Sequence, residues 1–297
     1  MIALACYTAR PFSRAGVRSD AVKIESGTPV SGIAFVAFDT ETTGLDLVED
    51  RLLDVGAVRF RLGKVERAYE SLVKPGRTIP DYSIAIHHIT EAMVADAPAP
   101  RKVLAELCEV LDGAVMIAHN APFDMAVLTA ELARQKMPVP DMRVLDTCVL
   151  AEALMPEQPT LKLGSLMGVL GSSETNDHRA LPDARCVIRL FEHLCQRVNG
   201  GAPTWQDLMD RHGPAFELRA FAQLAPRDQW HFAVAVNAIE ERRSVRVSVG
   251  QNGQAPRDLT LSPRGFALRE GGWCVVPEKP AEPVRMDAVR EMVKVAR

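Results

Sequence analysis

The chain has 297 residues, of which 47% are hydrophobic and 25% are charged, and its formal net charge is -3. These values indicate a soluble globular protein with one large domain and a smaller one, and the net charge alone does not predict a polyanionic partner. No apolar run in the sequence reaches the roughly 18 residues that a membrane-spanning helix needs, and the N-terminal MIALACY is too short for the core of a signal peptide. We therefore expect a cytoplasmic protein.

The charge is unevenly distributed along the chain. Residues 32–199 carry 17 Lys and Arg against 24 Asp and Glu, whereas residues 241–297 carry 11 against 7. An acidic half is thus joined to a basic half. The six cysteines are scattered without a C-x-x-C pair, so we interpret them as reduced thiols.

The chain begins with a predicted extension that leads into strands. Residues 1–31 mix Arg, Ser, Gly and Pro without periodicity, which predicts a poorly ordered N-terminal extension. The continuous apolar run of residues 33–38 predicts a central strand covered on both faces. Alternating apolar residues at 58–62, a turn at Gly63 and a partner strand ending near residue 73 predict a hairpin.

Helical spacing then alternates with short apolar strands. Strands are predicted at residues 114–118 and 144–145, and helices at 103–111, from Pro122 to about 132, at 146–154, at 162–170 and from Pro182 to 195. The stretch Gly-Gly-Ala-Pro at 200–203 ends this pattern and predicts a domain boundary. Linker helices are expected around residues 205–209 and 216–224, and a small α+β or β-barrel module follows them.

Three short motifs carry acids at positions where a chain emerges from a sheet. The segment FDTETTGL places Asp39 and Glu41 at the end of the predicted central strand, where residues i and i+2 point to the same face and so present two carboxylates that need a cation. In HNAPFD and HRALPD, Asp124 and Asp183 fall in the first turn of predicted helices, and His178 precedes Asp183 by five residues. Each motif alone also fits a solvated acid or an acid that favours the helix dipole.

In their order and positions, the three motifs resemble those of the DEDDh, or DnaQ-like, exonuclease family. This family includes the epsilon proofreading subunit of bacterial replicative DNA polymerase, ribonuclease T and oligoribonuclease. The resemblance covers about residues 32–197 and extends to the segments IHHIT and LDT, with one departure at His88, where many relatives have glycine. It implies an α/β, ribonuclease H-like fold: a mixed sheet with a hairpin on one side, helices on both faces, and the active site at the strand ends.

The resemblance also implies the catalytic groups. Asp39, Glu41, Asp124 and Asp183 would hold two divalent metal ions, Mg²⁺ or Mn²⁺, which prefer oxygen ligands. His178 would take the proton from the attacking water, a role that suits histidine at neutral pH.

Five further residues are candidates for binding the substrate. By the same resemblance, Thr42 and Thr43 would receive the terminal 3′ hydroxyl, and Leu45 and Phe123 would pack on the last bases. Asn120, in the second motif, completes the predicted substrate-binding set.

Residues 230–297 resemble the WYL domain, a small SH3-like β-barrel of many bacterial regulators. The resemblance lies in AIEERRSVRVSV and in the segment around Trp273, although the tripeptide that names the domain is degenerate here. The local excess of arginine fits contacts with nucleic-acid phosphates. It fits equally well a solvated basic face that docks against the acidic exonuclease half.

The sequence therefore predicts a metal-dependent 3′–5′ exonuclease that releases nucleoside monophosphates from single-stranded or frayed DNA in replication or repair. Its expected partners are DNA or RNA 3′ ends and a polymerase or other repair protein. Two alternatives stay open: an exoribonuclease on short RNA or RNA 3′ ends, and a regulatory protein that senses nucleic acid through the WYL-like domain. The expected domains are an extension (1–31), an exonuclease (32–199), a helical linker (200–229) and the WYL-like domain (230–297).

Overall fold

The main body is built on a mixed β-sheet. The computed structural model describes residues 23–174, 178–222, 231, 234–235, 237–250, 256–269, 272–278 and 282–295. In these residues the large sheet has six strands in the order β3-β2-β1-β4-β5-β6. The strands are β1 (Phe35–Thr42), β2 (Leu52–Arg61), β3 (Lys64–Leu72), β4 (Val115–Ala118), β5 (Arg143–Asp146) and β6 (Phe216–Glu217).

Strand β1 lies in the middle of this sheet. It pairs antiparallel with β2, which continues into the predicted hairpin with β3, and it pairs parallel with β4. Strand β5 runs parallel to β4, and β6 closes the edge antiparallel to β5. The first four residues of β1 are buried, as predicted for a strand covered on both faces.

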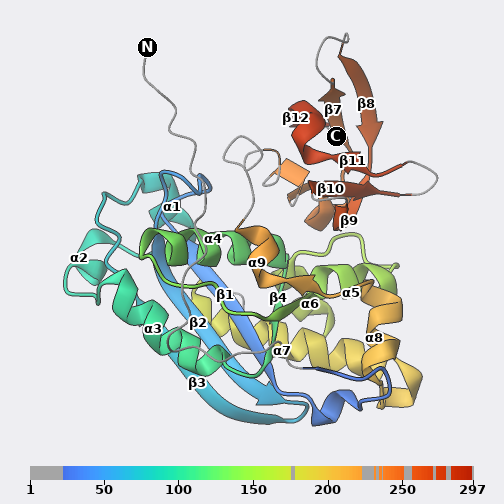
Figure 1. Cartoon of the computed structure of the whole chain (residues 1–297), viewed down its shortest axis with the longest axis horizontal. Helices are drawn as coiled ribbons and strands as arrows, with labels where there is room; N and C mark the ends of the chain where they lie inside the picture. The colour runs from blue at the N-terminus through green and yellow to red at the C-terminus, as the bar shows by residue number, and fades with distance from the viewer. Residues whose placement is uncertain are drawn as a thin grey trace.

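Helices cover both faces of the sheet (Figure 1). Helix α7 runs behind the strands and contacts β1 and β2, whereas α4 lies in front and contacts β1, β4 and β5. The helices up to the end of α7 are α1 (Asp81–His87), α2 (Glu91–Val94), α3 (Pro100–Leu111), α4 (Ala121–Arg134), α5 (Thr147–Leu154), α6 (Leu163–Val169) and α7 (Ala180–Gln196).

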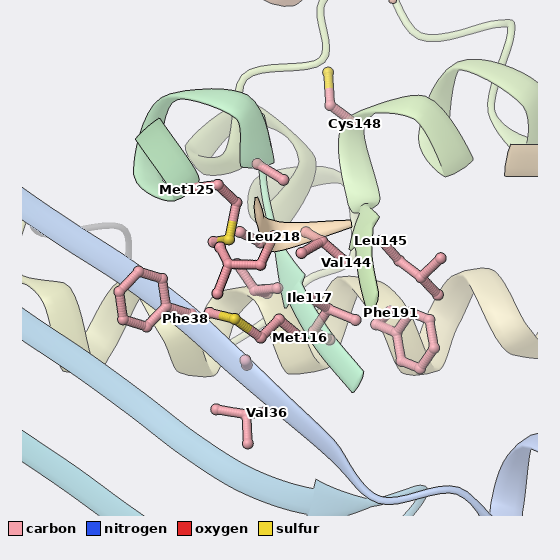
Figure 2. Packing of buried hydrophobic residues seen from close by; sticks show 14 of the residues in the cluster. Val36, Phe38, Met116, Ile117, Met125, Val144, Leu145, Cys148, Phe191 and Leu218 are labelled. Atoms are coloured by element: carbon pink, nitrogen blue, oxygen red, sulfur yellow. The ribbon is translucent and has the colours of Figure 1, made fainter. Parts of the chain in front are cut away.

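Apolar side chains from the sheet and both helical layers form the main core. Phe35 of β1 contacts Phe191 of α7, with 4.9 Å between ring centroids, and Phe60 of β2 completes this aromatic group. Figure 2 shows Phe38 of β1 and Met125 of α4 among the residues packed in this cluster. The core therefore holds the ends of β1 and α4 in fixed positions.

The predicted linker region packs on this body. Helix α8 (Trp205–His212) and helix α9 (Leu218–Phe221) lie on either side of β6 along the chain. Residues 216–217, predicted to be helical, form strand β6 instead, because they pair with the edge strand β5. Trp205, Leu208 and Phe221 are buried in the main core.

Part of the predicted N-terminal extension is packed in the same place. Residues 1–22 lie outside the described residues. Val30 is fully buried, and its N–H donates to the Pro203 carbonyl at 3.0 Å. The Trp205 N–H donates to the Thr28 carbonyl at 2.8 Å. Residues 23–31, which precede β1 in the chain, are thus hydrogen-bonded to the segment that begins α8.

A small β module follows α9, as predicted. In the described residues it consists of two three-stranded antiparallel sheets, ordered β11-β10-β9 and β12-β7-β8. Trp273 of β10 packs on Phe221 of α9, with 4.7 Å between ring centroids. The strands are β7 (Val245–Val249), β8 (Arg257–Leu261), β9 (Pro263–Arg269), β10 (Gly272–Pro277), β11 (Val284–Arg285) and β12 (Val289–Lys294).

None of the helices in the described part of the chain is both long enough and apolar enough to span a membrane.

Candidate active site

Two of the predicted acids emerge at the end of β1. Asp39 and Glu41 are two residues apart in this strand, and both line a cleft of about 410 Å³. Their strand pairs with β2 on one side and with β4 on the other, so the carboxylates lie at the carboxyl end of a central strand. This is the placement that the two-residue repeat of a strand predicts.

Asp124 reaches the same cleft from the first turn of α4. The chain leaves β4 and turns at Asn120, which has a left-handed backbone with φ of 61°, before the helix begins at Ala121 with Pro122 in its first turn. The backbone N–H and the hydroxyl of Thr40 both donate to Asp124 Oδ1, at 2.9 and 2.7 Å. Since Thr40 lies between Asp39 and Glu41, these bonds tie the acid of α4 to the acidic end of β1.

The third motif brings Asp183 and His178 to the cleft. Asp183 lies in the first turn of α7 and is buried, whereas His178 is exposed just before that helix. Ligand atoms of Glu41, His178 and Asp183 all lie within 4.8 Å of one another. Residues 175–177 lie outside the described residues.

Burial and neighbouring charges disfavour ionisation of these acids. Burial raises the pKa of Asp39 well above its ordinary value, and the charge of Asp124 raises it further. Burial also raises the pKa of Glu41 to about 8, with added repulsion from Asp183. For Asp124 burial raises the pKa to about 7, although the hydrogen bonds from Thr40 oppose this shift. Carboxylates that repel one another in this way ionise more readily when a cation lies between them.

The donor set therefore fits hard divalent cations. Mg²⁺ and Mn²⁺ prefer carboxylate oxygens, and they bind through a few carboxylates while keeping positions for water and phosphate. The four acids supply such oxygens from three separate elements, β1, α4 and α7, at one cleft.

A comparison with known proteins identifies the architecture. The family model RNase_T, described as an exonuclease, matches residues 36–191, a span that contains all four acids and His178. The chain belongs to this exonuclease family. The match confirms the predicted resemblance to DnaQ-like 3′–5′ exonucleases.

Several relatives of this exonuclease have names from DNA replication. The DNA polymerase III subunit epsilon of Treponema pallidum (strain Nichols) is 37% identical over 161 residues, which cover 54% of this chain and 75% of that protein. A DNA polymerase III subunit epsilon-like protein of Rhodobacter capsulatus is 38% identical over 175 residues, covering 56% of this chain and 24% of that protein. The PolC-type DNA polymerase III of Caldanaerobacter subterraneus is 31% identical over 181 residues, covering 60% of this chain but 13% of that protein. The exonuclease thus spans most of the first relative and less than a quarter of the other two.

A solved structure shares the fold beyond the family match. Escherichia coli exonuclease I, in complex with a dA16 oligonucleotide, superposes with a TM-score of 0.52 at 16% identity, over 82% of this chain and 55% of that chain. This coverage is longer than residues 36–191, so the similarity of fold extends outside the family match. The predicted ribonuclease H-like fold is confirmed, while the WYL-like domain stays a prediction.

The predicted substrate-binding residues divide into two groups. Leu45, Asn120 and Phe123 line the cleft, and Leu45 is 52% exposed, as a platform for a base requires. Thr42 and Thr43 are buried instead. The Thr42 hydroxyl donates to the Gly44 carbonyl at 2.5 Å, and the Thr43 hydroxyl donates to Asp50 Oδ1 at 2.7 Å. Both hydroxyls therefore shape the loop after β1 rather than face the cleft.

The exonuclease cleft has lining residues that the motifs did not predict. Lys162, Leu163 and Gly164 come from the start of α6, and Asn237 and Glu240 come from the chain beyond the family match. The positions of Asn237 and Glu240 could not be predicted, because nothing in the local sequence of residues 237–240 indicates which surface of the protein they contact.

A network of buried hydrogen bonds holds the backbone of the second motif in place. Asp146 Oδ1 accepts from the Asn120 N–H at 2.9 Å and from the Cys148 N–H at 2.8 Å. The Asp146 N–H in turn donates to His212 Nε2 at 2.9 Å, and burial lowers the pKa of His212 to about 4, so this ring is neutral and can accept. The motif LDT and helix α8 thus position the turn at Asn120.

The segment before β7 docks against the exonuclease body. The Glu240 carbonyl accepts from the Leu161 N–H at 2.7 Å, and its Oε1 accepts from Asn120 Nδ2 at 3.2 Å. Glu152 of α5 forms ion pairs with Arg242 and Arg264, at 2.8 and 2.7 Å. Two arginines of the basic C-terminal half are therefore engaged by an acid of the exonuclease half.

Proposed function

We propose that this exonuclease removes nucleoside monophosphates one at a time from the 3′ end of single-stranded or frayed DNA. The observation that carries the proposal is the convergence of four carboxylates and His178 at one cleft. We assign Asp39, Glu41, Asp124 and Asp183 as metal ligands in a phosphodiester hydrolase with two divalent cations.

Two bound Mg²⁺ ions would supply activation of a water and stabilisation of the leaving 3′ oxygen during in-line displacement at phosphorus. The residues of the chain have separate tasks. Thr40 orients Asp124 through two hydrogen bonds, and the resulting group of acids fixes where the scissile phosphate can lie. His178 stands within 4.8 Å of the ligand oxygens of Glu41 and Asp183, which suits it to accept the proton of the attacking water.

The terminal nucleotide would bind along the lining of the cleft. Leu45 and Phe123 offer apolar surfaces on which bases stack without strong sequence preference. Asn120 offers an amide for a polar contact with the terminal nucleotide. The loop containing Thr42 and Thr43 would receive the 3′ hydroxyl through its backbone, since both threonine hydroxyls are bonded inside the loop.

DNA is favoured as the substrate by the relatives from DNA replication, among them the epsilon subunit of Treponema pallidum. The same comparison supports a polymerase as a partner. We also propose that the exonuclease domain comprises residues 23–222, because residues 23–31 and α8 to α9 pack on its sheet and core. Residues 230–297 would then form the appended β module.

The function is tested by digesting matched single-stranded DNA and RNA oligonucleotides, each labelled at the 5′ or the 3′ end, with Mg²⁺, Mn²⁺ or EDTA. We expect a 3′ label to appear at once as a mononucleotide and a 5′ label to move down a ladder, with DNA cleaved faster than RNA and no cleavage in EDTA. The Asp183→Asn variant serves as the inactive control. Faster cleavage of RNA would favour the exoribonuclease, and no cleavage of either strand by the wild-type protein would refute the proposal.

A further inference from the structure

Arg179 lies between the proposed proton acceptor His178 and the helix that carries Asp183. Its Nε donates to Asp54 Oδ2 at 2.8 Å, and its Nη2 donates to Glu70 Oε1 at 3.4 Å. Asp54 lies on β2 and is fully buried, whereas the Arg179 side chain is about one-third exposed. The third motif is thus tied to the sheet by a charge pair one residue from His178.

Asp54 also bonds to the backbone at the start of α7. Its Oδ2 accepts from the Ala180 N–H at 3.4 Å, while its Oδ1 accepts from the Val55 N–H at 3.1 Å. Removing one partner of a buried ion pair leaves an uncompensated buried charge, which strongly favours keeping the pair intact. The carboxylate therefore fixes both the side chain of Arg179 and the first residue of the helix.

The backbone of α7 also approaches β2 closely at Gly56, two residues after Asp54. A Cβ atom on Gly56 would lie 2.1 Å from the Ala180 carbonyl carbon and 2.3 Å from the Leu181 nitrogen. A Cβ atom essentially never comes this close to an atom to which it is not linked by the chain, so this approach depends on glycine. Asp54 and Gly56 lie on the same face of the strand, and together they form a seat for the start of α7.

The position of this seat sets the direction of both catalytic groups. The Asp183 N–H donates to the Arg179 carbonyl at 3.0 Å, which closes the first turn of α7. On the other side, His178 has a left-handed backbone with φ of 52°, an uncommon conformation for a residue with a Cβ. A displacement of Arg179 would therefore move Asp183 and redirect His178 at once.

We infer that Arg179 is a positioning residue for the third motif, and that it acts through Asp54 to hold His178 and Asp183 against the acids of β1. The inference rests on the proposed function for its effect on turnover. Remote contacts of this kind matter because a misplacement of about 1 Å can lower a rate by about 10²-fold. A pair that served stability alone would lower the melting temperature and leave the turnover of the folded enzyme unchanged.

The test compares Arg179→Gln, Asp54→Asn and the double variant with wild type, all as the full chain. Arg189→Gln is the matched control, since Arg189 is an exposed residue that forms an ion pair with Glu192 on the same helix. We expect Arg179→Gln and Asp54→Asn each to lower kcat by about 10- to 100-fold, with KM changed by less than about twofold. The kcat of the double variant should be no lower than that of the less active single variant, because both changes break the same interaction. Arg179→Lys, which keeps the charge but not the fork of donors, should recover part of the loss.

Amide hydrogen exchange provides a second measurement that needs no activity. Exchange at the amides of residues 180, 181, 183 and 184 should become faster in Arg179→Gln and should match wild type in Arg189→Gln. Arg179→Gln with wild-type kcat, or with unchanged exchange in this turn, would overturn the inference. An inactive wild-type protein would instead count against the proposed function, and the exchange measurement would still decide whether Arg179 holds the start of α7.

Discussion

At the scale of single residues, the buried acids of the cleft make the stability of the fold depend on pH. Asp39, Glu41 and Asp124 have raised pKa values because they are buried and repel one another. The folded protein therefore keeps protons on these groups at pH values where the unfolded chain has already lost them. In metal-free protein the contribution of Glu41 to stability is thus lost as pH rises from about 4, its ordinary range, to about 8, and the raised pKa of Asp39 acts in the same direction.

This loss of stability with rising pH leads to a prediction for Asp39→Asn. The variant should lose nearly all hydrolysis, because a proposed metal ligand is neutralised without a change of shape, yet its metal-free form should melt at a higher temperature than wild type at pH 8. Mg²⁺ should raise the melting temperature of wild type more at pH 8 than at pH 6, and should have a smaller effect on the variant. Thermal melts at both pH values, with EDTA or Mg²⁺, measure this. A variant that hydrolyses DNA at the wild-type rate would remove Asp39 from the metal site.

His178 should affect turnover and leave metal binding intact. His178→Ala is expected to lower the rate by about 10²- to 10⁴-fold, the usual contribution of a general base. Affinity for Mn²⁺, measured by calorimetry, should stay close to that of wild type, since the four carboxylates remain. The acidic limb of the pH–rate profile should disappear in the variant. An unchanged acidic limb would show that another group takes the proton.

At the scale of the elements, the contact between β2 and α7 leaves no room for a side chain at Gly56. Gly56→Ala would place a methyl group against the backbone of Ala180, and backbone cannot rotate away as a side chain can. We expect a loss of at least about 1–3 kcal/mol in unfolding free energy, the usual range for overpacking, together with reduced turnover. Gly168→Ala in α6 is the control, because nothing lies within 4 Å of its added Cβ. Urea unfolding of both variants decides, and equal stabilities would contradict the assigned contact.

The elements also show where local patterns succeed and fail. The apolar stripe after Pro182 predicted α7, because one helix face must be buried whatever covers it. Residues 216–217 read as part of a helix but form β6, since the edge of β5 offers hydrogen bonds that a local pattern does not show. A pairing partner more than 70 residues away determined that element.

On the scale of the whole molecule, the region after residue 199 is needed for a complete core. A fragment of residues 23–222 should fold and cleave short oligonucleotides, because it retains the four acids, His178 and the buried residues of α8 and α9. A fragment of residues 32–199 lacks Trp205, Leu208 and Phe221 and should melt at a markedly lower temperature. Circular dichroism melts of the two fragments test this. Equal melting temperatures would place the boundary of the exonuclease domain at residue 199.

Binding of long strands tests the role of the β module. Arg242 and Arg264 are paired with Glu152, so they are not available to phosphates without breaking that contact. We therefore expect the full chain and the 23–222 fragment, both with Asp183→Asn to preserve the substrate, to bind a long single strand with similar dependence on salt. Fluorescence anisotropy over a range of salt concentrations measures the slopes. A clearly steeper slope for the full chain would show that the module contacts phosphates through other basic residues.

The sequence by itself determined the elements that carry the acids and the positions of the acids within them. Asp39 and Glu41 follow from the two-residue repeat of a strand, and Asp124 and Asp183 from the first turns of two helices, because these are rules of local backbone geometry. The tertiary structure decided what surrounds them. It turned the hydroxyls of Thr42 and Thr43 inward, seated α7 on β2, and brought Glu240 to the cleft. Local periodicity shows which face of an element is buried, but only the packing of the whole chain selects the distant segment that covers it.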